Sequence, residues 1–403
     1  MKIKLMSAYA FIISLFIITF LMFDLFVFNA FSYTDEILGV ISFVGIILHY
    51  LIDRQNVHPL KNQTNKILIL LVIIIIIGLV GNMLHSDLGT RFLDDLLEGF
   101  VFAKQYLIFI FLMLSLNQKN SLQIYKFVNK LSQLMVLVLF IALLADHFVG
   151  LGLTSRKGEF SFLAGFGATV SVWTVLFICI IVFGNTKHKA YYTVFGAIVI
   201  LFSRSGVGLL GLALLAVTYV FFIKQKKFHW YYLLIIIPFV VALSYDEISR
   251  YLLDSTAPRA LLLTYAFVTA NRFFPIGAGF ATYGSASAVS NYSRLYTEYG
   301  FNYRYGMSSS DAMFLMDSYY ARIVGETGYL GLILFVLIVY IIIRKMIFTV
   351  NDKHMKYYTL MLMGFLLAAG LGFGTGSAWG CTVYIIIAVM IKSASAQEII
   401  GVF

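Results

Sequence analysis

Long runs of apolar residues dominate this chain, and most of them are separated by short polar stretches. In the run at 67–80 the apolar residues are continuous and do not alternate with polar ones as they do in the strands of a membrane β-barrel. A bilayer-spanning helix needs about 20 mostly apolar residues, and in lipid the backbone must satisfy its own hydrogen bonds. The pattern predicts an all-α integral membrane protein with about 12 transmembrane helices. We expect these helices at 5–28, 36–52, 67–84, 100–116, 131–150, 160–183, 190–203, 206–223, 229–244, 319–343, 357–373 and 378–391. The short pairs 190–203/206–223 and 357–373/378–391 fit re-entrant hairpins as well as spans.

One long polar stretch, 245–318, interrupts this series of apolar runs. It predicts three parts: membrane helices at 1–244, a large outer loop at 245–318 that carries short helices, and membrane helices with a tail at 319–403. Within the loop we expect a short amphipathic helix that starts at Pro258, a residue well suited to the first helical position. The glycine-rich turn after it has little side-chain bulk to block a ligand. The loop has no lysine and is rich in tyrosine, at Tyr265, Tyr283, Tyr292, Tyr296, Tyr299, Tyr303 and Tyr305.

Composition supports the membrane class, because 61% of the residues are hydrophobic and only 12% are charged. Soluble domains carry about 25% charged residues. Both cysteines, Cys179 and Cys381, fall inside apolar runs and are interpreted as packing residues. The histidines show no metal-ligand spacing. We therefore expect neither a disulfide framework, nor a bound metal, nor another cofactor.

The lysines predict the orientation of the helices. The first apolar run is too long for a signal peptide, so we expect an uncleaved helix with Met1 in the cytoplasm. The even-numbered connections and the tail then hold nearly all the lysines on the cytoplasmic side, as the positive-inside rule requires. These residues are Lys61, Lys66, Lys119, Lys126, Lys130, Lys187, Lys189, Lys224, Lys226, Lys227, Lys345, Lys353, Lys356 and Lys392. The prediction is a multi-pass protein of the bacterial cytoplasmic membrane with both termini in the cytoplasm. Lys157, and Lys104 at the outer end of helix four, are the expected exceptions.

The arginines do not follow the lysines. Most are expected on or near the outer face: Arg91, Arg156, Arg204, Arg250, Arg259, Arg272, Arg294, Arg304 and Arg322. Because guanidinium is a planar fork that binds phosphate or carboxylate through two hydrogen bonds, this split predicts an anionic ligand at the outer face, such as a pyrophosphate. The alternative is that the arginines pair with outer acidic residues and fold the loops. Asp94, Asp95 and Glu98, close to Arg91, are interpreted as a solvated outer turn.

Four local motifs concentrate this chemistry. Residues 154–160 read TSRKGEF, an outer loop with two adjacent cations, and residues 203–206 read SRSG, a cation at a break between two apolar helices. A charge at such a break is a functional hypothesis by default. Residues 257–284 read APRALLLTYAFVTANRFFPIGAGFATYG, and residues 317–331 read DSYYARIVGETGYLG and run straight into the next helix.

In order, spacing and sidedness, these motifs resemble the O-antigen polymerase and O-antigen ligase superfamily of bacterial inner-membrane glycosyltransferases. The matching features are Ser203–Arg204 in mid-chain, Arg259 followed by Pro275–Gly277–Gly279, and Asp317–Ser318–Tyr320–Glu326–Gly328–Gly331 at the start of the next helix. Arg156 and Gly158 also fit the family pattern. The resemblance covers residues 150–345 by motif and the whole chain by topology.

The resemblance implies a GT-C-type helical fold and transfer of a glycan from undecaprenyl pyrophosphate on the outer side of the membrane. The polymerase branch extends the chain on a new lipid-linked repeat unit, whereas the ligase branch transfers the finished chain to lipid A–core. Family ligases have a histidine where this chain has Asp317, which favours the polymerase. The family also implies a chain-length regulator protein as a candidate partner, and nothing points to nucleic acid.

Residue roles follow from this chemistry as hypotheses. We expect Arg204 and Arg259 to bind the pyrophosphate with help from Arg156, in place of a divalent metal, and Asp317 to act as the base or to orient the acceptor. Each residue also has a structural interpretation. Asp317 is a strong candidate to cap the following helix. Further candidates for substrate binding are Arg272, Arg322 and Glu326, of which Arg322 and Glu326 are also spaced to pair along one helix face.

Two other function classes fit the same features. A flippase for lipid-linked sugars suits twelve helices, although the two halves show no internal repeat of the kind many transporters carry. A non-catalytic scaffold or glycan receptor suits the tyrosine-rich loop, whose rings either stack on sugars or lie near lipid headgroups. The lipid-linked species that accumulates after gene deletion discriminates a flippase from a polymerase. Loss of a flippase traps repeat units inside, whereas loss of a polymerase leaves single units outside.

Overall fold

The computed structural model describes residues 7–52, 63–155, 158–183, 188–224, 256–350, 352–372 and 376–394, and the single positions 238 and 254. Apart from position 238, the predicted helix 229–244 lies outside this described part, and so does the candidate Arg156. Within it, the only β-type pairings are two isolated bridges, and all other regular structure is helical.

The helices fall into three groups along the chain. The first group is α1 (Ala8–Phe26), α2 (Thr34–Ile52), α3 (Gln63–Leu84), α4 (Phe92–Ser115), α5 (Gln118–Val149), α6 (Gly167–Phe183), α7 (Lys189–Ser203) and α8 (Gly206–Val217), which continues as a π-helical stretch, η3 (Thr218–Lys224). The second is α11 (Pro258–Arg272), α12 (Ala286–Ser290) and α13 (Arg294–Glu298). The third is α14 (Tyr319–Thr349), α15 (Lys353–Ala369) and α16 (Ala378–Ala394). Short 3₁₀ turns are η1 (Asn29–Phe31), η2 (Ser86–Leu88) and η6 (Phe301–Tyr303).

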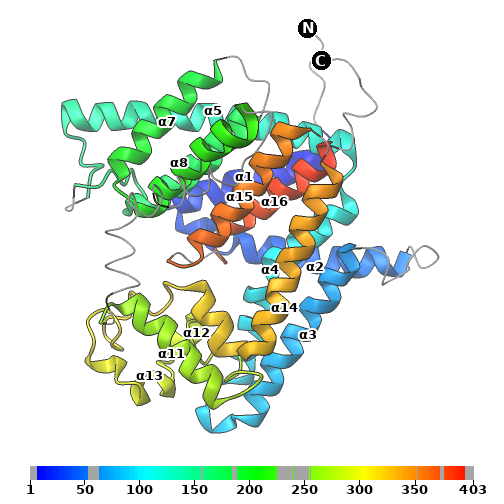
Figure 1. Cartoon of the computed structure of the whole chain (residues 1–403), viewed down its shortest axis with the longest axis vertical. Coiled ribbons are helices and arrows are strands. Elements are labelled where there is room, and N and C mark those ends of the chain that lie inside the picture. The colour runs from blue at the N-terminus through cyan, green and yellow to red at the C-terminus, as the bar shows by residue number, and fades with distance from the viewer. Residues whose placement is uncertain are drawn as a thin grey trace.

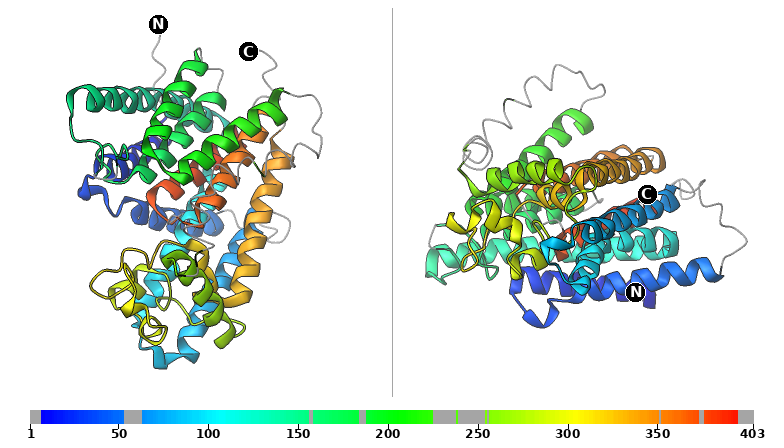
Figure 2. Two further views of the ribbon diagram at one scale, coloured as in Figure 1. Left: turned by 60° about the vertical axis from the view of Figure 1, so that its left-hand side comes forward. Right: turned by 90° about the horizontal axis from the view of Figure 1, so that it is seen from below.

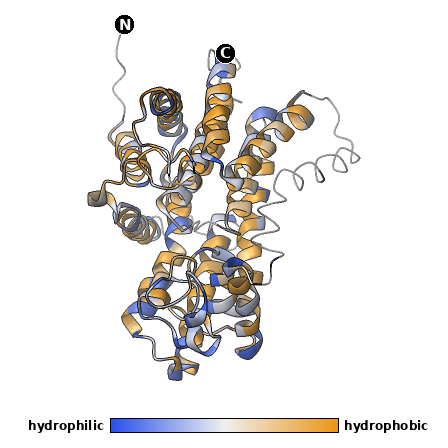
Figure 3. Ribbon diagram, turned by 90° about the vertical axis from the view of Figure 1, so that its left-hand side faces the viewer, coloured by the Kyte–Doolittle hydropathy of each residue, from blue (hydrophilic) through white to orange (hydrophobic). Residues whose placement is uncertain are grey.

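The described chain is an all-α protein with helices apolar enough to cross a membrane. Six of them, α1 to α5 and α14, are long enough to do so. Four shorter helices, α6, α7, α8 and α16, are also apolar. In Figure 3 most of the bundle is coloured as hydrophobic. Hydrophilic positions are more frequent in the part of the molecule at the bottom of this view. The expected total of twelve spans stays a prediction.

The molecule consists of a helical bundle with a smaller unit packed at one end, at the bottom of Figure 1 and of the left view of Figure 2. We call the smaller unit, residues 256–317, the loop domain, and the end of the bundle that it covers the loop end. The bundle has one large apolar core. The loop domain has its own core, which includes Leu262, Tyr283, Tyr296 and Phe301. The polar stretch expected as an outer loop is therefore a folded unit, and its predicted amphipathic helix is α11, with Pro258 as its first residue.

Two helices begin earlier than their apolar runs indicate. The structure starts α4 at Phe92 instead of 100, and its first turn contains Asp94 and Asp95. Carboxylates are favoured there because they face the positive end of the helix dipole. The structure starts α5 at Gln118 instead of 131, where the side chain of Asn117 caps the helix by accepting from the N–H of Asn120. Hydropathy alone identifies the apolar part of such a helix and does not predict the polar turns that extend it.

The helix predicted at 319–343 is two helices that fold back on each other. The ring of Phe335 lies 6.1 Å from those of both Tyr319 and Tyr320, centroid to centroid. In one straight helix, residues 15 positions apart would be separated by about 22 Å. The reversal occurs at Gly328, whose φ of 63° and ψ of −163° are not helical. A short helix, 319–327, therefore precedes the long apolar helix, 329–349.

Glycines in the loop domain allow its backbone to approach two membrane helices. A Cβ on Gly277 would lie 2.4 Å from the backbone nitrogen of Gly328, and one on Gly279 would lie 2.5 Å from that of Asn82. Main-chain bonds from Ala278 to Gly325 and from Gly279 to Glu326 complete this contact. The expectation that these glycines leave space for a ligand is therefore wrong, because the space is filled by α14 and α3.

Candidate functional site

Arg259 and Asp317 meet at the junction of the loop domain with the bundle. Nε and Nη2 of Arg259 each lie 3.0 Å from Oδ2 of Asp317. Arg259 is in the first turn of α11, and Asp317 precedes α14. Both side chains are about one quarter exposed, at 23% and 24%. The helix cap is Ser318, whose hydroxyl accepts from the N–H of Ala321. The alternative that Asp317 caps this helix is therefore wrong.

The carboxyl group of Asp317 has the properties of a base held by a cation. Both bonds from Arg259 end on Oδ2, and Oδ1 accepts no hydrogen bond from any described residue. Burial raises the pKa of Asp317, and the neighbouring Arg259 partly offsets this rise. A carboxylate of raised pKa is a stronger proton acceptor than an ordinary surface aspartate. One oxygen thus fixes the group in place, while the other is available to a substrate.

Arg204 lies at the break between α7 and α8 in a conformation that arginine rarely adopts. Its φ is 48° and ψ 31°, in the left-handed region where helix ends normally use glycine or asparagine. The side chain is exposed, its guanidinium lies beside Gly158, and it forms no ion pair with any described residue. A strained backbone that carries a charge without a partner indicates a requirement for that side chain at that place.

Packing of α8 against α15 places Arg204 at the loop end. The two helices are antiparallel, since Phe222 contacts Tyr357 while Gly211 contacts Phe365. Continuing past Gly211 toward the start of α8 therefore leads toward the end of α15. That end contacts the Arg259–Asp317 pair, because Gly370 accepts the N–H of Tyr319 and the guanidinium of Arg259 lies beside Gly372. Arg204 and Arg259 thus lie toward the same end of this helix pair.

Arg272 lies on the outside of the loop domain. Its Nη1 is 2.5 Å from Oε2 of Glu298, which also pairs with Arg294 on the same short helix. The side chain is 44% exposed. An exposed pair of this kind contributes less than about 1 kcal/mol. This contact corresponds to the structural alternative, in which arginines tie the outer elements together.

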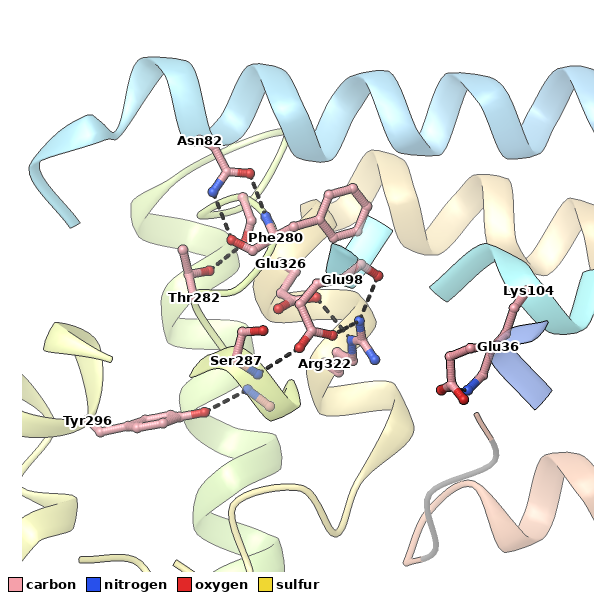
Figure 4. A network of polar contacts seen from close by, with 12 residues as sticks. Glu36, Asn82, Glu98, Lys104, Phe280, Thr282, Ser287, Tyr296, Arg322 and Glu326 are labelled. Atoms are coloured by element: carbon pink, nitrogen blue, oxygen red, sulfur yellow. Dashed lines mark hydrogen bonds and ion pairs between the residues drawn. The ribbon is translucent and has the colours of Figure 1, made fainter. Parts of the chain in front are cut away.

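Arg322 and Glu326 form a buried cluster with a partner that the sequence pattern did not identify. Arg322 on the short helix 319–327 donates to Glu98 Oε2 at 2.7 Å, to the Glu98 carbonyl at 3.0 Å and to Glu326 Oε2 at 3.1 Å (Figure 4). Glu98 and Glu326 are each 1% exposed. Glu98 also accepts the N–H of Ser287 in the first turn of α12. The cluster therefore joins α4, α14 and the loop domain.

A second buried contact joins α3 to the loop domain beside this cluster. The amide of Asn82 accepts the N–H of Phe280 at 2.8 Å and donates to the carbonyl of the same residue at 2.7 Å (Figure 4). It also donates to Asp95 at 2.9 Å. Asp95 and Glu98 are both buried. The prediction of a solvated outer turn at 94–98 is therefore wrong, and the only signal available was that these acids lie three residues apart, on one face of a helix.

Lys104 is buried within α4 and does not lie at the helix end. Its ammonium lies 2.5 Å from Asp35 Oδ2 and 2.5 Å from Glu36 Oε1 at the start of α2. The helix starts at Phe92, so Lys104 is three turns inside it. The neighbouring Gln105 donates to the hydroxyl of Tyr319, two residues after Asp317. Lys104 thus fixes α2 against α4.

Among the described residues, no group of three His, Cys, Asp or Glu side chains is arranged to hold a metal ion. No protein-family model matches this chain, and no curated protein matches it significantly. The side chains at the loop end must therefore carry the assignment of function. They combine the Arg259–Asp317 pair with Arg204, which lies toward the same end of the α8–α15 helix pair.

Proposed function

We propose that this chain is a membrane-embedded glycosyltransferase of the O-antigen polymerase type, acting on the outer face of the cytoplasmic membrane. It transfers a growing glycan from undecaprenyl pyrophosphate to a newly displayed lipid-linked repeat unit, in O-antigen, capsule or related polysaccharide synthesis. The active site is the Arg259–Asp317 pair, with Arg204 toward the same end of the α8–α15 helix pair and Arg156 assisting.

The observation that carries this proposal is the geometry of the Arg259–Asp317 pair. Glycosyl transfer needs a base for the acceptor hydroxyl and cations for the departing pyrophosphate. Asp317 is held by Arg259 through one oxygen and has the other available. The pair is half-buried at the end of an apolar bundle, where a lipid-linked substrate can keep its tail in the membrane and present its pyrophosphate and sugar to the loop domain.

The proposed step conserves atoms and charge. The acceptor hydroxyl oxygen attacks the anomeric carbon of the donor sugar, and its proton passes to Oδ1 of Asp317. The bond between that carbon and the pyrophosphate oxygen breaks, and the electron pair leaves with undecaprenyl pyrophosphate. Arg204 and Arg259 stabilise the charge that develops on this leaving group, the role that a divalent metal fills in other enzymes. Asp317 then returns the proton to solvent.

The polymerase branch is favoured over the ligase branch by the residue at position 317. The related ligases have a histidine there, whereas this chain has an aspartate bonded to an arginine. A carboxylate paired with an arginine can accept a proton directly. We therefore expect the acceptor to be a second lipid-linked repeat unit and not lipid A–core.

An assay with purified protein tests the proposal. The protein in nanodiscs receives undecaprenyl-pyrophosphate-linked repeat units from the cells that produce it, in the presence of EDTA, and the products are separated on a gel. A ladder of polymer lengths is expected. If folded protein gives no ladder with this repeat unit, the polymerase assignment is wrong. If a ladder forms only after a divalent metal is added, the role given to the arginines is wrong.

A further inference from the structure

The structure divides the tyrosines of the loop domain into two groups. Five of them build or cover its core: Tyr265, Tyr283, Tyr292, Tyr296 and Tyr299. The other two, Tyr303 and Tyr305, are 86% and 76% exposed. An exposed aromatic pair has no role in the core and commonly marks an interaction site. Of the tyrosines predicted to stack on sugars, only Tyr303 and Tyr305 therefore have rings exposed enough to do so.

Both tyrosines belong to a segment made of consecutive turns, residues 303–316, which we call the arm. An isolated bridge joins Ser308 to Asp311, and the N–H of Phe314 bonds the carbonyl of Gly306 at 2.9 Å. The ring of Phe314 lies where a side chain at Gly306 would be, since a Cβ there would approach it to 2.2 Å. At the base of the arm, the hydroxyl of Tyr292 donates to the carbonyl of Met307. The arm is therefore a fixed surface with its own packing.

The arm leads directly to the proposed base. The arm passes through Phe314, whose carbonyl accepts the N–H of Asp317 in a tight turn. The ring of Tyr305 lies 6.1 Å from that of Phe314. A turn of this kind keeps its first and last Cα atoms within about 7 Å. The exposed ring of Tyr305 is therefore within the length of a short oligosaccharide from Asp317.

The arm offers aromatic faces that suit carbohydrate. Tyr303 ends the 3₁₀ turn η6, Arg304 is extended with φ −108° and ψ 140°, and Tyr305 lies in the turn that the N–H of Met307 closes on the carbonyl of Arg304. An exposed aromatic ring is a platform for a sugar ring, whose apolar C–H face packs on the negative face of the aromatic ring. Arg304 itself is exposed, and the tip of the arm holds Ser308 and Ser310. Charged and hydroxyl groups at these positions disfavour insertion into lipid.

We propose that the arm binds the glycan of the lipid-linked substrate, with Tyr303 and Tyr305 stacking on sugar rings next to the one that reacts at Asp317. This inference rests on the proposed function for the identity of the ligand, a membrane-anchored oligosaccharide. It adds a subsite that holds sugars, separate from the arginines that bind pyrophosphate.

A binding experiment tests the arm without requiring polymerisation. The probe is the lipid-free repeat-unit oligosaccharide released from the polysaccharide of the producing cells, titrated calorimetrically into protein in nanodiscs. The double variant Tyr303→Ala/Tyr305→Ala is expected to weaken binding at least tenfold, because it removes both stacking faces. Tyr303→Phe/Tyr305→Phe keeps the faces and should bind like the natural chain. Tyr33→Ala is the matched control, since Tyr33 is 74% exposed next to α2 but is not part of the arm.

The outcomes separate the arm from the proposed function. Unchanged affinity of the double alanine variant, or no binding by the natural chain, overturns the inference. The variant Tyr305→Trp tests the alternative that the arm lies in the bilayer. Strong quenching of the fluorescence of the introduced tryptophan by brominated lipids would also overturn the inference. If arm-dependent binding occurs but no polymer forms, the polymerase proposal fails and the subsite remains. If polymer forms while the double variant binds normally, only the subsite is wrong.

Discussion

Two arginine–carboxylate sites at the loop end differ in their burial, and this difference distinguishes a stabilising role from a catalytic one. In the buried cluster, Arg322 is shared by Glu98 and Glu326, each of which is 1% exposed. In the junction site, Arg259 holds one oxygen of Asp317 and both side chains are about one quarter exposed. The first site is closed to a substrate, whereas the second presents an available carboxylate oxygen at the surface. Similar residue types thus serve stability in one place and, by our proposal, catalysis in the other.

The largest effect on stability is expected when the buried cluster loses its cation. Arg322→Ala leaves Glu98 and Glu326 buried without a cation, which costs about 3–5 kcal/mol. Thermal unfolding of the purified protein in detergent should show a large loss. Arg272→Ala is the control, because its pair with Glu298 is exposed and contributes less than about 1 kcal/mol. Equal stability of the two variants would remove the distinction between the sites.

At the junction site the expected loss is in rate. Arg259→Ala removes a cation from the leaving group and should slow transfer by about 10²–10³-fold, the typical effect of deleting one stabilising donor. Arg91→Ala, which removes another exposed arginine near the same end, should leave the rate within a factor of about two. The check is the initial rate of polymer formation at matched amounts of folded protein. Equal rates for the two variants would exclude Arg259 from the active site.

The pH dependence of transfer should report the environment of Asp317. Burial raises the pKa of this carboxyl and Arg259 partly offsets the rise. The base works only when ionised, so activity falls as the pH drops through this raised pKa, above the usual value of about 3.9 for aspartate. Arg259→Ala removes the offsetting charge and should move the acid limb of kcat/KM to higher pH in the residual activity. A limb that stays in place or moves to lower pH would contradict this account.

The smallest effect concerns the strained backbone at Arg204. Glycine adopts a φ of 48° without steric cost, so Arg204→Gly should raise stability by about 0.5–1 kcal/mol. The same change removes a proposed pyrophosphate ligand and should slow transfer at least tenfold. Opposite signs for stability and rate would identify a residue retained for function. A variant that is more stable and equally active would show that the side chain is dispensable.

The sequence predicts the elements of this fold better than their extents. Continuous apolar runs indicate the bundle helices, and Pro258 correctly marks the start of α11. Polar extensions are missed, because the first turns of α4 carry acids that favour a helix end but oppose membrane insertion. The reversal at Gly328 is also missed, since both of its arms have helical periodicity and only tertiary contacts reveal the fold-back.

Pairings in the candidate site depend on contacts between distant residues. Motif order singled out Arg259 and Asp317, which the structure brings together across 58 positions. It also singled out Arg322 and Glu326, whose spacing gave their pair directly. It gave no indication that Glu98 is the third member of this cluster. Glu98 is buried only because the loop domain packs over it, and the sequence around it does not distinguish a buried glutamate from an exposed one. Glycines interpreted as open space proved to be contacts for the same reason.

The most direct test compares Asp317→Asn with Glu98→Gln in the polymer assay and in thermal unfolding. Asparagine keeps the shape of Asp317 but cannot accept a proton, so transfer should fall by about 10²–10⁴-fold while the unfolding temperature stays close to that of the natural chain. Glu98→Gln weakens a buried ion pair and should mainly lower the unfolding temperature. Transfer by Asp317→Asn at the natural rate would contradict the central claim that this carboxylate is the base.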